Sequence, residues 1–360
     1  MKAIVKSNPG IGLEIMDVPM PRIGPDDVLI KVKAATICGS DFHIYNWDEQ
    51  WTTDTIKGGQ IVGHEFCGEV ADLGCNVTDL ARGELVTAEG HIGCGTCYYC
   101  QSGQAHICPK QTLIGFHRPG GFAEFIAVPA TNIVKLGKLP LIVGTLQDPF
   151  GCAVHSTQKV NLTGATVLVT GCGPIGLMTI ALAKLAGAQR IFATEKSPYR
   201  ISMASKIGAD LVFNSQESKV ADVIYEKTKD KSGVDVLFEM SGTPEGVNQG
   251  FKILRPGGTA VLLGLPKQPV NFDFANDLIA KGVTVHGIIG RLIFETWYQA
   301  RAYINDNDPV KSMDFSKIVT HRMMLDNFDE AFKLMLSGNA GKVILFPDKE
   351  SLLQSYDELP

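Results

Sequence analysis

The sequence predicts an α/β protein in which a β-rich part precedes a doubly wound parallel sheet. Three observations carry this prediction. The 360 residues exceed what one hydrophobic core usually organises, so we expect more than one domain. Short apolar runs separated by glycine and proline turns fill residues 1–149. From Thr166, strand-like and helix-like segments alternate, which favours parallel strands with right-handed crossovers.

The first part, residues 1–149, is expected to consist mainly of short strands. Val28–Ala34 enters with apolar residues and then alternates, as a half-buried strand does. Turn signals recur at Asn8–Gly10, Gly24–Asp26 and Pro119–Gly121. No long helical period is visible, so we predict no long helix before Pro149.

The second part supplies the strands of the parallel sheet. We predict them at Thr166–Thr170, Arg190–Thr194, Asp210–Phe213, Val234–Glu239, Thr259–Leu263 and Val283–Gly287. Helical segments are expected at Ile175–Ala186 and after Ser197-Pro198, where serine can cap the helix and proline can occupy its first position.

The last part, residues 294–360, has a different pattern. Two helix-like stretches, Phe294–Ile304 and Phe328–Leu336, precede a strand at Lys342–Phe346. The polar residues from Asp348 to Pro360 are expected to form a frayed end.

Composition excludes several functional classes. The formal net charge is -5 and no basic run occurs, which disfavours a nucleic-acid partner. The apolar segment Val160–Ala183 contains several glycines and a proline, so it indicates a buried strand, turn and helix rather than a membrane span. With no apolar leader near Met1, we expect a cytoplasmic protein without a membrane partner.

A glycine-rich turn indicates a dinucleotide site. The segment Gly171-Cys172-Gly173-Pro174-Ile175-Gly176 follows a predicted strand and opens a predicted helix, and Glu195 ends the next strand. The glycines allow a tight turn, approach of the pyrophosphate and close helix packing, while the helix N-terminus attracts phosphate. Glu195 would accept hydrogen bonds from the ribose and so favour NAD over NADP, although Lys196 and Arg200 keep the opposite preference open.

Four closely spaced cysteines indicate a structural zinc site. Four of the nine cysteines follow the pattern Cys94-x2-Cys97-x2-Cys100-x7-Cys108. Zinc binds four thiolates tetrahedrally, and the common iron–sulfur spacings differ from this one. Because all four ligands come from the protein, we expect this site to be closed.

A second group of ligand types indicates an open metal site. Cys38 lies in Cys38-Gly39-Ser40-Asp41-Phe42-His43, and His64 and Glu65 lie in the next glycine-rich segment. Three protein ligands leave zinc one position for a substrate, whose hydroxyl it would acidify. Ser40 and His43 could carry the released proton, and Asp148 could be a fourth ligand or support one.

The run Gly63-His64-Glu65-x2-Gly68-x5-Gly74-x2-Val77 resembles the signature of the zinc-containing, medium-chain alcohol dehydrogenases. The cysteine lobe and the glycine turn follow in that family's order, and the resemblance extends to Pro347. It implies a GroES-like catalytic domain at 1–149, a Rossmann domain at 150–293 and a segment at 294–360 that returns to the catalytic domain.

The resemblance also implies roles for individual residues. It places the catalytic zinc on Cys38, His64 and Glu65, the proton relay on Ser40 and His43, and an acidic support at Asp148. It implies two zinc ions per chain, NAD as cofactor and a homotetramer. The implied cofactor contacts beyond the glycine turn are Ile175, Glu195, Arg200, Leu263, Gly264, Leu265, Ile288 and Ile289.

Several stretches, among them Cys38–Trp47 and Phe294–Tyr298, resemble the branch of this family that oxidises L-threonine. Three positions depart from the usual residue: Ser40 replaces threonine, Glu195 replaces aspartate and Cys152 replaces asparagine. Two alternatives therefore stay open. One is a polyol or butanediol dehydrogenase, because the two residues that could approach the pocket of an amino-acid substrate, Asp48 and Glu49, could equally form a solvated turn. The other is a non-catalytic, nucleotide-binding zinc protein.

Overall fold

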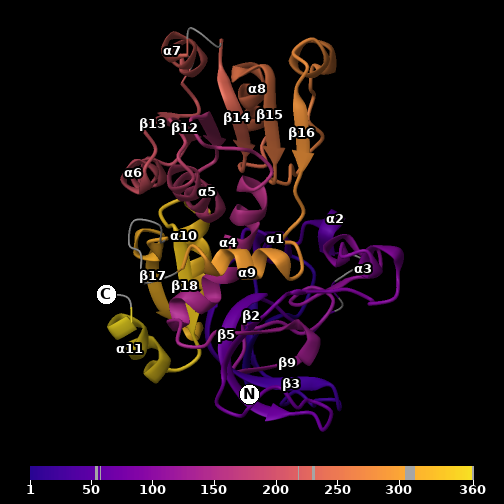
Figure 1. Ribbon diagram of the computed structural model, residues 1–360. Coiled ribbons are helices and arrows are strands. Elements are labelled where there is room, and N and C mark those ends of the chain that lie inside the picture. The colour runs from indigo at the N-terminus through magenta and orange to yellow at the C-terminus, as the bar shows by residue number, and fades with distance from the viewer. Residues whose placement is uncertain (53–55, 57, 218, 229–231, 305–312, 359–360) are drawn as a thin grey trace. The chain divides into compact units, whose positions relative to one another are not determined.

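The computed structural model describes residues 1–52, 56, 58–217, 219–228, 232–304 and 313–358 (Figure 1). The chain forms two compact units. The first comprises Met1–Pro149, Val319–Ser337 and Lys342–Pro360, and the second comprises Phe150–Ile318 and Gly338–Gly341. The chain thus returns to the first unit at Val319, later than the expected Phe294, because α9 (Glu295–Arg301) and the described residues 313–318 belong to the second unit.

The first unit is built mainly from antiparallel strands (Figure 1). Its seven-stranded sheet has the order β10-β6-β5-β3-β18-β17, with β9 also paired to β3. The strands of this sheet are β3 (Asp27–Thr36), β5 (Glu65–Leu73), β6 (Leu85–Ala88), β9 (Phe125–Pro129), β10 (Ile133–Lys135), β17 (Val319–Met324) and β18 (Lys342–Phe346). Two small sheets accompany it, formed by β1 (Lys2–Lys6), β2 (Glu14–Asp17) and β4 (Gln60–Ile61), and by β7 (His91–Ile92) and β8 (Thr112–Leu113).

The C-terminal strands complete the large sheet of the first unit. β17 and β18 run parallel and are joined through α10 (Phe328–Leu336). β18 then pairs antiparallel with β3, with Ile344 opposite Thr36 and Leu345 opposite Ala35. This register brings the last strand of the chain next to the residues that precede Cys38.

The remaining helices of the first unit are mostly short. They are α1 (Asp41–Asn46), α2 (Glu49–Thr52), α3 (Tyr98–Gln101), α11 (Lys349–Glu358) and the 3₁₀ turns η1 (Ala105–Ile107), η2 (Ala130–Asn132) and η5 (Leu325–Asn327). The 17-residue helix α4 (Leu141–Thr157) contradicts the expectation of no long helix before Pro149. Its proline lies inside the helix, so the boundary between the units falls within a continuous helix.

The C-terminal end is a helix, so the expectation of a frayed end was wrong for its described residues. Asp348 caps α11 by accepting a hydrogen bond from the Ser351 backbone N–H at 2.8 Å. Near the other end, the Glu358 carboxylate accepts the N–H of Leu141, the first residue of α4, at 2.7 Å. Ser351 and Ser355 are buried against the unit, since small side chains allow the helix to approach closely.

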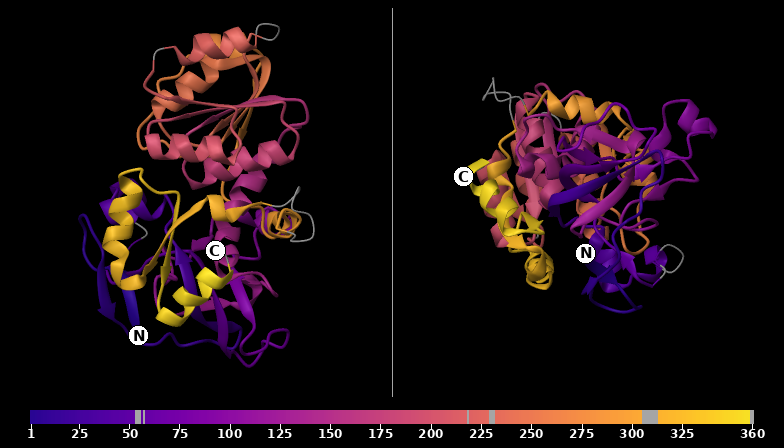
Figure 2. Two further views of the ribbon diagram at one scale, coloured as in Figure 1. Left: turned by 90° about the vertical axis from the view of Figure 1, so that its left-hand side faces the viewer. Right: turned by 90° about the horizontal axis from the view of Figure 1, so that it is seen from below.

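The second unit is a six-stranded parallel sheet of order β13-β12-β11-β14-β15-β16, which is the Rossmann order. Helices lie on both faces of the sheet (Figure 2). The strands are β11 (Thr166–Thr170), β12 (Arg190–Glu195), β13 (Leu211–Asn214), β14 (Val234–Glu239), β15 (Leu254–Leu262) and β16 (Thr284–Gly287). The helices are α5 (Pro174–Leu185), α6 (Pro198–Ile207), α7 (Val220–Lys227), α8 (Pro244–Ile253), α9, the π-helical η3 (Phe274–Ile279) and the 3₁₀ turn η4 (Phe315–Lys317). The predicted fold class is confirmed.

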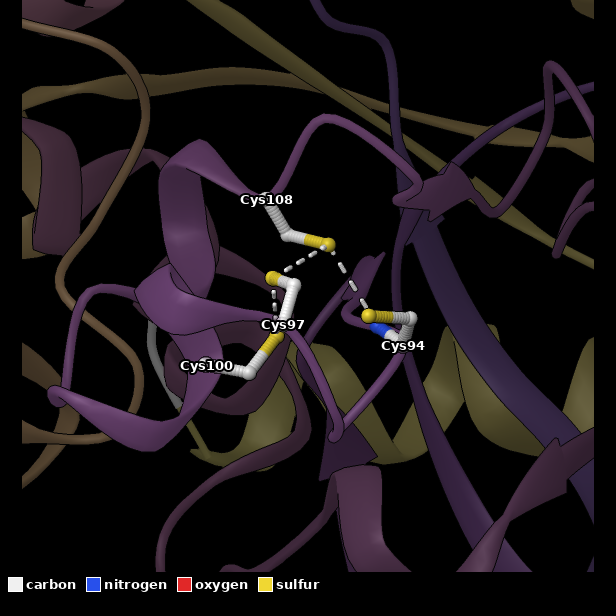
Figure 3. A group of neighbouring side chains, drawn as sticks. All are labelled: Cys94, Cys97, Cys100 and Cys108. Carbon is white, nitrogen blue, oxygen red and sulfur yellow. Dashed lines mark hydrogen bonds between the residues drawn. The ribbon is translucent and has the colours of Figure 1, made fainter.

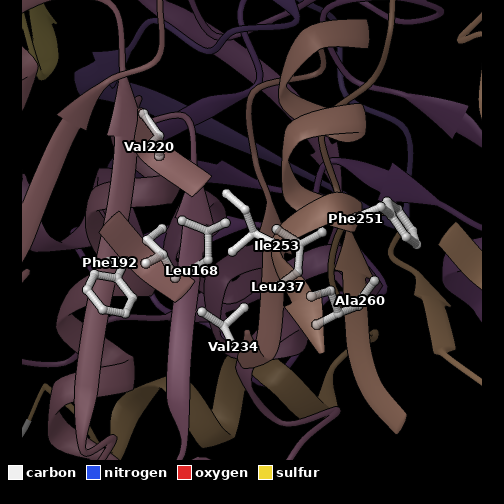
Figure 4. Packing of buried hydrophobic residues seen from close by; sticks show 10 residues of the cluster. Leu168, Phe192, Val220, Val234, Leu237, Phe251, Ile253 and Ala260 are labelled. Atoms are coloured by element: carbon white, nitrogen blue, oxygen red, sulfur yellow. The ribbon is translucent and has the colours of Figure 1, made fainter. Parts of the chain in front are cut away.

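One core of the second unit lies between the parallel sheet and its helices (Figure 4). Leu168, Phe192, Leu237 and Ala260 point from four neighbouring strands into this cluster, and Phe251 joins them from α8. Each of the four strand residues is fully buried. Burial of such side chains on both faces explains why these strands are nearly continuous apolar runs. Among the described residues, no helix is both long and apolar enough to cross a membrane.

Candidate metal centres and nucleotide site

The four cysteines of the predicted structural site converge in the first unit (Figure 3). Their sulfur atoms all lie within 4.8 Å of one another. The Cys97 sulfur is 3.6 Å from that of Cys100 and 3.6 Å from that of Cys108. Four thiolates placed tetrahedrally at about 2.3 Å from zinc would have sulfurs about 3.8 Å apart, so this donor set fits a zinc ion.

The loop around these cysteines is shaped by backbone hydrogen bonds and glycine. Hydrogen bonds from the backbone N–H and the hydroxyl of Thr96 lower the pKa of the Cys94 thiol to about 6, which favours the thiolate form that binds metal. The backbone N–H groups of Cys94 and Lys110 point to the Cys108 sulfur at 3.5 and 3.4 Å. Gly95 has a φ of +73°, a conformation that lets the chain turn between the first two ligands.

The second set of ligand types also converges, and again within the first unit. One ligand atom from each of Cys38, His64 and Glu65 lies within 4.8 Å of the others. Cys38 follows β3, and Glu65 begins β5 opposite Thr36 in the β3–β5 register. Sheet pairing therefore brings together Cys38 and Glu65, which are 27 residues apart in the sequence. Asp148 is buried on α4 but is not part of this group of three.

A buried carboxylate, Asp41, to which the sequence motifs assign no role, holds two of these ligands. One of its oxygens lies 3.3 Å from Nδ1 of His64, and the other accepts the Cys38 backbone N–H at 2.8 Å. Burial opposes the charged imidazole, but the charges of Asp41 and Cys38 outweigh it and raise the pKa of His64 well above its usual range. A carboxylate on Nδ1 orients the ring so that Nε2 can bind a metal.

Glu65 has a counter-ion from the far end of the sequence. Its carboxylate accepts hydrogen bonds from the Thr36 hydroxyl and the Lys342 ammonium group, and both charged side chains are buried. The Lys342 amine also donates to the Ile37 carbonyl at 2.9 Å. Burial opposes ionisation, but Lys342 outweighs it and lowers the pKa of Glu65. Glu65 is therefore a carboxylate shared between a lysine and the candidate metal position.

The candidate relay residues lie at the start of α1. The Ser40 hydroxyl lies 3.4 Å from Nε2 of His64, so it is beside the candidate metal position. His43 lies three residues later, within the same helix, and its Nδ1 is 2.6 Å from the Asp48 carboxylate. Asp48 is thus a hydrogen-bond partner of His43 and not simply a solvated residue of the turn.

The three glycines of the turn in the second unit have different surroundings. Gly171 has a φ of +85°, and a Cβ there would lie 2.7 Å from the Cα of Ser241. A Cβ on Gly176 would lie 2.0 Å from the Gly171 carbonyl oxygen. At Gly173, by contrast, a Cβ would meet nothing within 4 Å. Gly171 and Gly176 therefore permit close packing of the backbone. Gly173 leaves space before the α5 N-terminus, which has no side-chain cap.

Glu195 is buried and bonded to the loop that follows its strand. Its carboxylate accepts backbone N–H groups from Cys172 and Lys196 at 2.8 Å and from Ser197 at 3.0 Å. It therefore holds the glycine turn against the end of β12, in addition to any contact with a ribose. Arg200 donates from Nε to the Ala340 carbonyl at 2.9 Å within the same unit.

A further buried carboxylate, Glu239, anchors the other turns at the carboxyl ends of the strands. One of its side-chain oxygens accepts the backbone N–H groups of Ser241 and Gly242 at 2.9 and 3.1 Å. Its backbone carbonyl accepts those of Leu263 and Gly264, two predicted cofactor contacts. Burial raises the pKa of Glu239. Sequence reasoning missed this role because the acid ends a strand without any motif around it.

The other predicted cofactor contacts follow the same edge of the sheet. Leu265 and Ile289 are exposed, whereas Ile288, which continues from β16, is buried. Cys152, which departs from the family pattern, lies in the second unit, where its sulfur faces the Arg291 guanidinium at 3.8 Å. It therefore has a buried partner within that unit.

Two family models match the chain in the order of its two units. The alcohol dehydrogenase GroES-like domain matches residues 24–138, and the zinc-binding dehydrogenase model matches residues 174–306. An L-threonine 3-dehydrogenase of Bacillus velezensis is 43% identical over 349 residues, which are 96% of this chain and 99% of that protein. The L-threonine 3-dehydrogenase of Bacillus subtilis is 41% identical, with 96% of this chain and 99% of that protein covered.

Solved structures show the same fold at lower sequence identity. The 2R,3R-butanediol dehydrogenase of Bacillus subtilis is 29% identical, with a TM-score of 0.83 over 96% of this chain and 99% of that one. The alcohol dehydrogenase of Thermus sp. ATN1 is 28% identical, with a TM-score of 0.84 over the same shares of the two chains.

Proposed function

The chain belongs to the zinc-containing, medium-chain alcohol dehydrogenases, and on this premise we propose that it oxidises L-threonine to 2-amino-3-oxobutanoate with NAD⁺. The substrate assignment rests on the sequence identity of 41–43% to L-threonine 3-dehydrogenases across nearly the whole of both chains. The solved butanediol dehydrogenase is 29% identical, so it supports the reaction class more than a diol substrate.

Residues of the first unit are assigned to metal binding and to proton transfer. We assign the catalytic zinc to Cys38, His64 and Glu65, since three protein ligands would leave a four-coordinate zinc one position for a substrate oxygen. A zinc ion held there would supply acidification of the substrate hydroxyl, and a bound nicotinamide would supply the hydride acceptor. Ser40 accepts the hydroxyl proton and His43 passes it to solvent, so that alcohol and NAD⁺ give ketone, NADH and one proton.

The supporting residues keep this arrangement in place. Asp41 orients the His64 ring, and Lys342 balances the charge of Glu65 within the buried site. Asp148 is proposed as an acidic support of the site rather than as a ligand, since it lies outside the group of three. The lobe of Cys94, Cys97, Cys100 and Cys108 is assigned a closed, structural zinc.

The cofactor is assigned to the second unit. The α5 N-terminus and the glycine turn would bind the pyrophosphate, and Glu195 and Arg200 would meet the adenosine ribose. The turns around Leu263–Leu265 and Ile288-Ile289 are assigned as further contacts of the cofactor. The negative charge of Glu195 supports NAD over NADP, because it would repel a 2′-phosphate.

We further propose that the enzyme works as a homotetramer in the cytoplasm. Light scattering coupled to size-exclusion chromatography would test the assembly, with an expected mass of four times the 38.9 kDa chain. A monomeric mass would overturn it.

The first experiment is NADH formation, followed at its absorbance, with L-threonine, sorbitol and 2,3-butanediol compared at equal concentrations. Activity confined to L-threonine supports the proposal. Activity confined to a diol or polyol would retain the reaction and replace the substrate. Two zinc equivalents per chain together with turnover would discard a non-catalytic role, whereas one equivalent without turnover of any alcohol would favour it.

A further inference from the structure

We propose that Asp48 is a positioning residue of the proton relay: it fixes the ring orientation and the tautomer of His43. This inference rests on the relay role that the proposed function gives to His43. The observation behind it is the distance of 2.6 Å between Nδ1 of His43 and a carboxylate oxygen of Asp48.

The turn between the two residues is built to bring them together. α1 ends at Asn46, and Trp47 adopts a left-handed conformation with a φ of 58°. The chain therefore reverses, and the Asp48 backbone N–H donates to the His43 carbonyl at 2.8 Å. Glycine usually occupies such a position, and a larger residue there disfavours the conformation by about 1–2 kcal/mol. A tryptophan in this conformation therefore needs support from its surroundings.

That support comes from a buried lysine on the first strand. The Lys6 ammonium group lies 5.4 Å from the centre of the Trp47 ring, in a cation–π contact. The same group donates to the Tyr45 carbonyl at 3.3 Å and to the Gly12 carbonyl at 2.9 Å. Lys6 thus holds the C-terminal end of α1 and the tryptophan at once. The turn that places Asp48 beside His43 is consequently stabilised by the hydrogen bond of Lys6 to Tyr45 and by its contact with the Trp47 ring.

The pairing has a direct chemical consequence for the imidazole. A carboxylate can only accept a hydrogen bond, so Nδ1 of His43 must carry its hydrogen toward Asp48. The lone pair of the neutral ring then lies on Nε2, which becomes the nitrogen that can take a proton. Once the ring holds both protons, the Asp48 carboxylate supplies the neighbouring negative charge. The same logic positions a histidine base in other enzymes.

The α1 helix also connects this pair to the candidate metal site. Ser40 and His43 are three residues apart, so they lie on one face of the helix. The Ser40 hydroxyl is 3.4 Å from Nε2 of His64. Asp48 therefore acts indirectly, by positioning His43, and is not expected to contact the substrate.

The test compares Asp48→Asn with Asp72→Asn, a matched control that removes an exposed carboxylate paired with Arg82 in the same unit. Both variants are purified with zinc bound, and kcat and KM are measured with whichever secondary alcohol the wild-type enzyme oxidises. We expect Asp48→Asn to lower kcat about 10–100-fold and to change KM less than about threefold. The expected loss in kcat is smaller than the full rate enhancement that a general base contributes, because His43 itself remains. Asp72→Asn should change kcat less than about twofold, because it leaves the His43 pairing intact. A kcat for Asp48→Asn that matches the wild type, or an equal loss in Asp72→Asn, would overturn the proposal.

A second measurement does not depend on turnover. Nitrogen-15 NMR of histidine-labelled protein reports which ring nitrogen carries hydrogen, and His43→Asn identifies the signals. We expect the Nδ1-protonated tautomer in the wild type and its loss in Asp48→Asn. The opposite tautomer in the wild type would refute the role of Asp48. If the tautomer is as expected but no alcohol is oxidised, the proposed function fails while the pairing stands.

Discussion

The buried pair of Glu65 and Lys342 allows a quantitative test of how the first unit is held together. The variant Lys342→Met keeps most of the apolar stem and removes the charge. Both partners are about 1% exposed, so the Glu65 carboxylate would stay buried, with the Thr36 hydroxyl still donating to it but without its counter-ion. Removing one partner of a buried pair usually destabilises a protein by about 3–5 kcal/mol. We expect a loss of that size.

The assay is urea unfolding followed by circular dichroism at pH 7 on protein depleted of metal, since a bound cation would also neutralise Glu65. The double variant Glu65→Gln/Lys342→Met should recover most of the lost stability, because neither charge remains. Lys333→Met is the control, since that lysine pairs with Asp329 on an exposed surface. A loss below about 1 kcal/mol in Lys342→Met would refute the buried pair, because this is the range of exposed pairs.

Three further predictions concern the candidate sites. Cys38→Ser should abolish turnover while the Kd for NADH, measured by fluorescence, stays unchanged; a weaker Kd would contradict the assignment of cofactor binding to the second unit. Glu195→Ala should weaken NAD⁺ binding and reduce the ratio of NAD⁺ to NADP⁺ affinity in calorimetric titrations, because the charge that repels a 2′-phosphate is gone. An unchanged ratio would mean that another residue determines the cofactor preference. Metal should leave the Cys38–His64–Glu65 site faster at pH 6 than at pH 8 in the presence of a chelator. The raised pKa of His64 means that protons compete with the metal there, and equal rates of zinc loss at both pH values would argue against this competition.

Features whose parts lie close together along the chain follow from the amino-acid sequence alone. The strands and helices of the parallel sheet, the glycine turn and the four-cysteine lobe each arise within a short segment. Local rules of periodicity, turn geometry and ligand spacing describe such segments. For this reason the sequence suffices to predict the fold class and the four residues that meet in the cysteine lobe.

The contacts made across the sheets and turns depend instead on the tertiary structure. Lys342 reaches Glu65 because β18 pairs with β3 and β3 with β5, a register that no local pattern reports. His43 meets Asp48 because one tryptophan adopts a left-handed conformation, which residue preferences disfavour. The C-terminal helix forms although its own sequence is polar, since its ends are held by Asp348 and by contact with α4. A buried polar group needs a hydrogen-bond or charge partner, because burial without one is unfavourable. The tertiary structure decides which distant residue supplies that partner.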